Sequence, residues 1–143
     1  SQVPPAKEIP YSITPIGHIE SPLKLREEAP KQGTEGAPEA WLVLNDAVGQ
    51  GLAGIEAGHE LVLLTWLHQA RRDVLQVHPR WDASAPLAGV FATRSPDRPN
   101  PVGLHRVRVL EILAGRLRVA PLEAIDGTPV IDIKPVLPES ADC

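Results

Sequence analysis

Short apolar runs bounded by Gly, Pro, Asn and Asp recur along the chain with the lengths typical of β-strands. The densest run, residues 60–67, reads ELVLLTWL and contains no charge after its first residue. Strands are expected at residues 11–19, 41–44, 60–67, 74–77, 89–93, 102–113, 116–122 and 130–134. Only residues 46–55 favour a helix, and a short one. The pattern therefore predicts a protein made mostly of strands.

Polar and apolar residues alternate along 106–109 and again along 116–119. This period of two is typical of a sheet with one solvated face. Ala114 and Gly115 between the two segments suit a hairpin turn. About eight short antiparallel strands joined by turns favour a small all-β barrel over a doubly wound α/β sheet.

The composition agrees with one compact, loop-rich domain. The chain has 143 residues, of which 16 are Pro and 11 are Gly, and 43% of its residues are apolar. A single hydrophobic core suits this length, and the Pro and Gly content predicts long, turn-rich loops. We expect an extended or disordered arm over residues 1–10, a barrel domain over 11–138 and a tail over 139–143.

Several function classes are disfavoured. The one cysteine, Cys143, gives no disulfide within the chain and no thiolate zinc site, and the five histidines have no metal-ligand spacing. No run approaches the roughly 18 apolar residues of a membrane span, and the first ten residues lack a signal-peptide core. We expect a soluble, cytoplasmic protein without a metal or a membrane partner.

Charge is distributed unevenly. The net charge is −4, yet residues 71–118 contain nine arginines, four acidic residues and no lysine. A basic middle in an acidic chain suits local recognition of an anion or an RNA backbone. The alternative is that Arg106, Arg108, Arg116 and Arg118 form only the solvated face of two strands.

The stretch 91–103, FATRSPDRPNPVG, is the most distinctive segment. Its three prolines fix φ and remove backbone donors, so it cannot be a helix and should be a stiff loop. Stiffness lowers the entropy lost when Arg94, Arg98 and Asn100 are ordered around a ligand. A Pro-rich surface connection with solvated charges remains the alternative.

Two motifs carry a family resemblance. FATRSPDRPNPVGLHRVRVLEI, followed by EAIDGTPVIDIKP, resembles the TsaA-like family, whose named members, the TrmO enzymes, are tRNA N6-threonylcarbamoyladenosine methyltransferases. The resemblance runs over about residues 11–138. It implies a β-barrel that pairs as a homodimer and takes a methyl group from S-adenosylmethionine, with tRNA as the substrate.

The resemblance also implies which residues contact the methyl donor. They come from four segments: Pro30, Lys31 and Gln32; His68 and Gln69; Arg94 and Leu104; and Glu123, Ala124, Ile125 and Asp126. Arg94 matches the arginine of the family's TRSP turn. For His68 the residues alone leave a second reading, a strand-end histidine bonded to backbone.

Catalytic and nucleic-acid contacts are expected near the same loops. Asp126 is the candidate general base, although Asp-Gly-Thr-Pro also favours a tight turn without any ligand. Asn100 would orient the acceptor, and Lys134 joins Asp132 in either a buried network or a solvated pair. The predicted tRNA contacts are Arg71, Arg72, Arg80 and Arg98, with salt-dependent affinity.

The chain departs from the family pattern at two positions. Lys31 stands where arginine is usual, which keeps the charge and loses the bidentate fork. Val136 stands where the family commonly has tyrosine, which removes an aromatic ring. The lysine bears on the donor contact, whereas the missing tyrosine bears on the tRNA substrate more than on the donor. Methylation of a small molecule and a non-catalytic S-adenosylmethionine sensor or adaptor therefore stay open as alternatives.

Residues 49–54, GQGLAG, fit the pattern of a dinucleotide-binding loop. That motif requires a helix after the glycines and then a parallel strand, in a unit of roughly 30 residues. Here the next predicted strand begins at residue 60. We therefore reject a dinucleotide fold.

Overall fold

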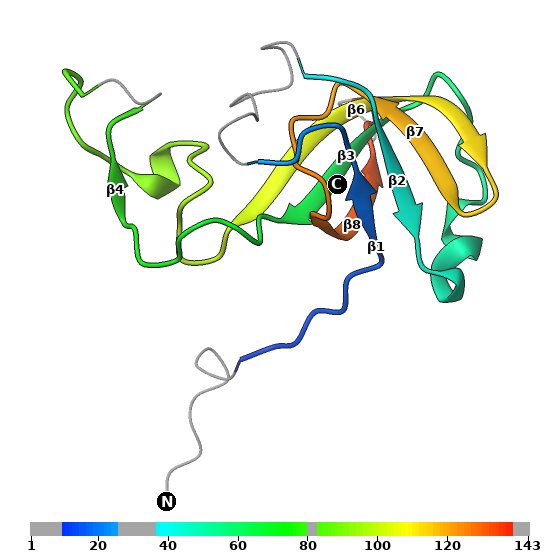
Figure 1. The fold of residues 1–143 in the computed structure, drawn as a ribbon, viewed down its shortest axis with the longest axis horizontal. Helices are drawn as coiled ribbons and strands as arrows, with labels where there is room; N and C mark the ends of the chain where they lie inside the picture. The colour runs from blue at the N-terminus through cyan, green and yellow to red at the C-terminus, as the bar shows by residue number, and fades with distance from the viewer. Residues whose placement is uncertain (1–9, 26–36, 80–82, 139–143) are drawn as a thin grey trace, which may run out of the picture.

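A computed structural model describes residues 10–25, 37–79 and 83–138 of the 143-residue chain. Six strands close into an antiparallel barrel in the order β1-β2-β7-β6-β3-β8 (Figure 1). These strands are β1 (Gly17–Glu20), β2 (Ala40–Leu44), β3 (Glu60–Trp66), β6 (Val102–Leu113), β7 (Arg116–Ala120) and β8 (Pro129–Pro135). The expected all-β, antiparallel barrel is confirmed.

Strand direction divides the connections between two ends of the barrel. Because neighbouring strands are antiparallel, β1, β3 and β7 finish at the end where β2, β6 and β8 begin. We call this the loop end, since the connections 21–39, 67–101 and 121–128 leave from it. The opposite hairpin end has the 114–115 turn and the connection 45–59, with the 3-10 helix η4 (Asp46–Leu52).

The core fills the barrel with one residue in two from each strand. β2 and β3 alternate buried and half-buried positions, and the fully buried side chains include Ile19, Leu42, Leu63, Val107 and Leu117. The outward positions of β6 carry Arg106 and Arg108 instead. This period-two pattern is the one that the sequence shows along 106–109, because a barrel strand has one face inside and one in solvent.

Residues 67–79 and 83–101 form a lobe beside the barrel, which we call the extension. It contains the short strands β4 (Gln76–Val77) and β5 (Ala88–Gly89), paired with each other, and the 3-10 helix η6 (Val90–Ala92). In Figure 1 the extension lies to one side of the barrel, joined to it where β3 ends and β6 begins.

Of the expected strands, 11–19 and 89–93 differ most from the observed ones. The first strand begins at Gly17, because residues 11–15 are exposed and pair with no strand of the described chain. Residues 89–93 form η6 after β5, and Thr93 closes that turn by donating its amide to the Val90 carbonyl at 3.0 Å. Apart from Pro10, the predicted arm and tail lie outside the described residues.

Candidate functional site

The loop end of the barrel gathers most of the predicted site. The extension carries His68, Gln69 and Arg94, β6 begins beside Leu104, and the connection from β7 to β8 contains residues 123–126. These segments are far apart in sequence and meet because antiparallel strands bring their connections to one end. Four other predicted residues, Pro30, Lys31, Gln32 and Arg80, lie outside the described residues.

The two halves of the extension are tied together by backbone hydrogen bonds. The amide of Arg71 donates to Oδ1 of Asp97 at 2.8 Å, and the amide of Arg98 donates to the Arg71 carbonyl at 3.0 Å. Nearer the barrel, the amide of Leu67 donates to the Pro101 carbonyl at 2.8 Å. The His68-containing segment and the proline-rich loop therefore form one unit.

Three of the arginines predicted to contact tRNA are already engaged within the protein. Arg72 donates to the Pro99 carbonyl and to Oδ1 of Asn100, and Arg71 forms a 3.0 Å ion pair with Asp73. Arg98 donates from Nη2 to the carbonyls of Val90 and Thr93, and its Nε is buried with no partner among the described residues. Arg98 thus stabilises the extension from inside.

Arg94 differs from these arginines. Its side chain is exposed, and within the described part of the chain its guanidinium has no hydrogen bond or ion pair. His68, Asn100 and Leu104 are also exposed at this end. A planar guanidinium that is exposed on a stiff loop is suited to bidentate binding of a carboxylate or phosphate.

Asp126 is an ionised anchor. Its Oδ1 accepts the Ser21 amide at 2.9 Å, and its Oδ2 lies 3.1 Å from Nζ of Lys24. The Ser21 hydrogen bond first, and then Lys24, hold the pKa of Asp126 below its usual value. The neighbouring Ala124 and Ile125 are buried, so they fix this turn by packing.

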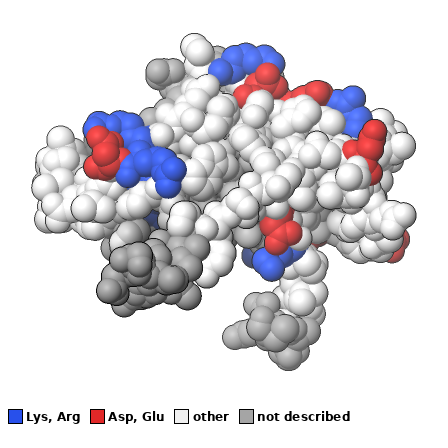
Figure 2. All heavy atoms as spheres, turned by 90° about the horizontal axis from the view of Figure 1, so that it is seen from below, with Lys and Arg blue, Asp and Glu red and all other residues white. Residues whose placement is uncertain are grey.

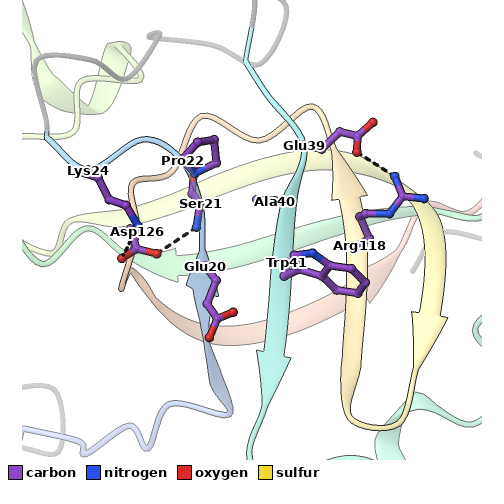
Figure 3. A pocket seen from close by; sticks show the side chains of 9 residues that line it. All are labelled: Glu20, Ser21, Pro22, Lys24, Glu39, Ala40, Trp41, Arg118 and Asp126. Carbon is purple, nitrogen blue, oxygen red and sulfur yellow. Dashed lines mark hydrogen bonds and ion pairs between the residues drawn. The ribbon is translucent and has the colours of Figure 1, made fainter.

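A pocket of about 560 Å³ opens beside Asp126 (Figure 3). It is lined by Glu20, Ser21, Pro22, Lys24, Glu39, Ala40, Trp41, Arg118 and Asp126. The Trp41 side chain projects from β2 along the outer face of the barrel, toward Arg118 of β7. This pocket therefore offers an aromatic ring and charges of both signs at the loop end.

A second set of polar residues lies inside the barrel and was not predicted. Nδ1 of His105 lies 2.5 Å from Oε1 of Glu123, and its Nε2 lies 2.6 Å from Oγ1 of Thr65. The signal was present in the strand pattern, because Thr65 and His105 occupy inward positions that are otherwise apolar or glycine. A polar residue at an inward position predicts a buried partner.

The outer arginines form ion pairs on the solvated face. Arg106 pairs with Glu60 at 2.8 Å, Arg116 with Glu20 at 2.5 Å, and Arg118 with Glu39 and Glu111. In Figure 2 most basic side chains on the visible face lie against acidic ones. The structure favours the solvated-face reading for these arginines.

Lys134 and the glycine-rich segment are not at the loop end. Lys134 lies near the end of β8, where its Nζ is 3.8 Å from Oδ2 of Asp132 and both side chains are at least half exposed, a solvated pair. Residues 49–52 of the glycine-rich segment form the second half of η4 at the hairpin end. The segment is therefore not followed by the helix that a dinucleotide-binding loop requires. The structure brings neither of them to Asp126.

The described residues contain no group of three or more His, Cys, Asp or Glu side chains that could hold a metal ion. Within the same residues no helix has the length and apolar character needed to cross a membrane.

Comparison with known proteins gives consistent matches. The model of the tRNA-methyltransferase O N-terminal domain matches residues 18–143. An S-adenosyl-L-methionine-binding protein of Archaeoglobus fulgidus is 43% identical over 131 residues, which cover 92% of each chain. A probable S-adenosyl-L-methionine-binding protein of Methanothermobacter thermautotrophicus is 45% identical over 123 residues, 86% of this chain and 88% of that one.

Solved structures share the fold. The crystal structure of TrmO from Pseudomonas aeruginosa superposes with a TM-score of 0.74 and 30% identity, covering 94% of this chain. The match covers 60% of that longer chain. The present chain therefore spans about three fifths of the solved protein that it resembles.

Proposed function

Because the chain belongs to the tRNA-methyltransferase O N-terminal domain family, we propose that it is an S-adenosylmethionine-dependent methyltransferase whose donor binds at the loop end of the barrel. The observation that carries this proposal is the exposed guanidinium of Arg94, which has no hydrogen bond or ion pair within the described residues. It lies at the end where the segments 68–69 and 123–126 also lie. The names of the archaeal relatives support the choice of donor.

The chemistry of these residues fits the donor. Arg94 would bind the carboxylate of its methionine part, and Leu104, which is 48% exposed on β6, would give an apolar contact for the adenine. Glu123 has His105 as its one hydrogen-bond partner among the described residues, so a carboxylate oxygen is left to accept from the donor. Residues 30–32 and His68 and Gln69 remain predicted contacts.

When bound, S-adenosylmethionine supplies an electrophilic methyl group on a sulfonium. The residues of the site would exclude water from this methyl group. They would also hold the acceptor nitrogen in line with the bond from the methyl carbon to sulfur. Asn100 is the proposed orienting group, although its Oδ1 already accepts from Arg72.

The contacts of Asp126 favour a role other than general base. A carboxylate whose pKa is lowered by the Ser21 amide and Lys24 is a weak base. It would accept a proton from the acceptor nitrogen only late in methyl transfer, once that nitrogen has become cationic. We therefore assign to Asp126 mainly the stabilisation of positive charge. Lys134, at the other end of the barrel, has no part in the proposed site.

We propose N6-threonylcarbamoyladenosine in tRNA as the acceptor, because the family is one of tRNA methyltransferases. The predicted RNA contacts are then Arg71, Arg72, Arg80 and Arg98. Since the guanidinium groups of three of these are engaged within the protein, they would act on RNA mainly through their charge.

A homodimer in the cytoplasm belongs to the same proposal. The extension exposes Leu75, Leu87 and Phe91 by 64%, 55% and 81%, which is apolar surface suited to a second copy. The cytoplasm is proposed because a tRNA acceptor would be met there. Sedimentation of the native protein beside a Phe91→Glu variant tests the dimer, because the added charge should shift the population to monomer.

A sensor that binds the donor without turnover is the second candidate, favoured by relatives that are named only as binding proteins. One assay separates the functions. The protein is incubated with methyl-labelled S-adenosylmethionine and with tRNA carrying threonylcarbamoyladenosine, tRNA lacking it, or a nuclease-treated cell extract.

Label in the modified tRNA alone would support the proposed acceptor. Label that survives nuclease treatment would indicate a small-molecule substrate instead. Donor binding without label in any of the three samples would favour the sensor.

A further inference from the structure

Three polar side chains form a chain of hydrogen bonds within the barrel: Thr65 of β3, His105 of β6, and Glu123 of the connection from β7 to β8. Thr65 is fully buried, His105 is 4% exposed, and the Glu123 side chain is 16% exposed. Burial of polar groups in an apolar core is unfavourable unless every group is bonded. Here each imidazole nitrogen has a partner, so the arrangement is satisfied.

The surrounding backbone is shaped around these side chains. Gly103 is paired with Thr65 in the β3-β6 register. A Cβ at residue 103 would lie 2.4 Å from Oγ1 of Thr65 and 2.7 Å from Nε2 of His105. The hydrogen bond between Thr65 and His105 therefore occupies the space that any larger residue at 103 would need.

The order carboxylate, imidazole, hydroxyl resembles a nucleophilic triad, but its geometry excludes that role. Thr65 has no exposed surface, so its hydroxyl cannot reach a substrate. These three side chains also do not fit a metal ion. Only His105 and Glu123 are common metal ligands, and no third His, Cys, Asp or Glu of the described residues completes a cluster with them. The remaining role for the buried side chains is to position the one group of the three that reaches the surface.

That group is Glu123. Its Oε1 is held by His105, and within the described chain it has no other hydrogen bond, so Oε2 can accept from a ligand. His105 also follows Leu104 directly, and Thr65 lies three residues before His68. The hydrogen bonds from Thr65 through His105 to Glu123 thus link the three segments that contain His68, Leu104 and Glu123, all of which belong to the proposed donor site.

We propose that His105, supported by Thr65, is a positioning residue that fixes the Glu123 carboxylate so that Oε2 accepts a hydroxyl or ammonium group of bound S-adenosylmethionine. This rests on the proposed function. A free glutamate side chain loses rotamer freedom when it binds a ligand, whereas one already held by an imidazole does not. His105 would act on donor affinity without touching the donor.

Calorimetric titration of S-adenosylmethionine into four variants tests this. Glu123→Gln removes the charge and keeps the shape. His105→Asn places an amide donor near the position of Nδ1, and His105→Gln places one near Nε2, so only the first can keep the bond to Glu123. His59→Gln is the matched control, because His59 is an exposed histidine at the hairpin end.

We expect Glu123→Gln and His105→Gln to weaken donor binding by about tenfold or more, with His105→Asn and His59→Gln within about threefold of the native protein. If the substitutions acted only by lowering the stability of the core, His105→Asn and His105→Gln would weaken donor binding to a similar extent. Equal affinity of the native protein and His105→Gln would overturn the inference and leave the donor site intact. Absence of binding to the native protein would overturn both.

A spectroscopic measurement covers the case in which His105→Gln does not fold. Nitrogen-15 spectra of the histidine side chains in the native protein report the His105 imidazole directly, with the same spectra of Glu123→Gln for assignment. We expect the His105 resonances to shift when S-adenosylmethionine is added, because the carboxylate that it holds takes a second bond. Unchanged His105 resonances at saturating donor would contradict the proposal.

Discussion

The guanidinium of Arg72 donates to Oδ1 of Asn100 over 3.0 Å and to the carbonyl of Pro99 over 2.7 Å. Its charge lies 5.2 Å from the centroid of the Trp66 ring. One side chain therefore ties the proline-rich bend to the end of β3. The prolines at 99 and 101 have no amide hydrogens to donate, so the bend depends on donors from elsewhere in the chain.

Replacement of Arg72 should loosen this bend. Arg72→Ala removes the donors, and Arg72→Lys keeps the charge but cannot span both acceptors. We expect the amides of Asn100 and Val102 to exchange with deuterium about tenfold faster in both variants. Arg71→Ala is the control, since Arg71 is bonded to the loop through its backbone and should leave this exchange unchanged. Native exchange in Arg72→Lys would show that charge alone suffices.

Gly103 should not tolerate a side chain. Gly103→Ala places a methyl group against the Thr65 hydroxyl and the His105 ring, and overpacking of this kind costs about 1–3 kcal/mol. Urea unfolding measures the loss. Gly51→Ala is matched to it, because a Cβ there meets nothing within 4 Å and should change the free energy of unfolding by less than about 0.5 kcal/mol. Equal stability of the two variants would contradict this packing.

Leu63 tests the closed core. It has no exposed surface and lies in β3, which pairs with both β6 and β8. Leu63→Ala should lower the free energy of unfolding by about 2–5 kcal/mol. Leu113→Ala removes the same atoms from a side chain that is 48% exposed and should cost much less. A small loss at Leu63 would show that the barrel interior is not close-packed.

The pH dependence of stability should report the Asp126 anchor. Its pKa in the folded protein lies below its usual value, because of the Ser21 amide and Lys24. The unfolded chain therefore takes up this proton first as the pH falls. The contribution is complete above the unfolded pKa of about 3.9 and is lost as the pH falls through the folded value.

Asp126→Asn should accordingly lose less stability than the native protein between about pH 6 and about pH 3 in urea unfolding. Asp46→Asn provides the control, since Asp46 is exposed at the start of η4 and should leave the acid dependence unchanged. The same acid loss in Asp126→Asn as in the native protein would show that the Ser21 and Lys24 contacts do not stabilise the fold.

Much of the barrel could be predicted because strands with one face in solvent alternate polar and apolar residues. The alternation along 106–109 and 116–119 identifies a face in water, and β6 begins and ends where the sequence predicts. The first strand was predicted too long, since apolar residues such as Ile13 suggest a strand whether or not a partner lies beside them. Pairing partners are a property of the closed barrel and leave no local signal.

The site was predictable only in part. Arg94 is predicted from a motif, and its exposed guanidinium suits the proposed donor contact. By contrast, Arg72 and Arg98 are of the residue type that commonly contacts nucleic acids. Their guanidinium groups nevertheless donate to backbone carbonyls within the extension. His105 was missed because its partners, Thr65 and Glu123, are 40 and 18 residues away and meet it only inside the closed barrel.

The most direct test of the donor site is calorimetric titration of S-adenosylmethionine into the native protein, Arg94→Ala and Arg106→Ala. The account predicts about micromolar binding to the native protein, a loss of about tenfold or more in Arg94→Ala, and native affinity in Arg106→Ala, whose arginine is paired with Glu60 on the outer face. No binding to the native protein, or equal binding to Arg94→Ala, would contradict it.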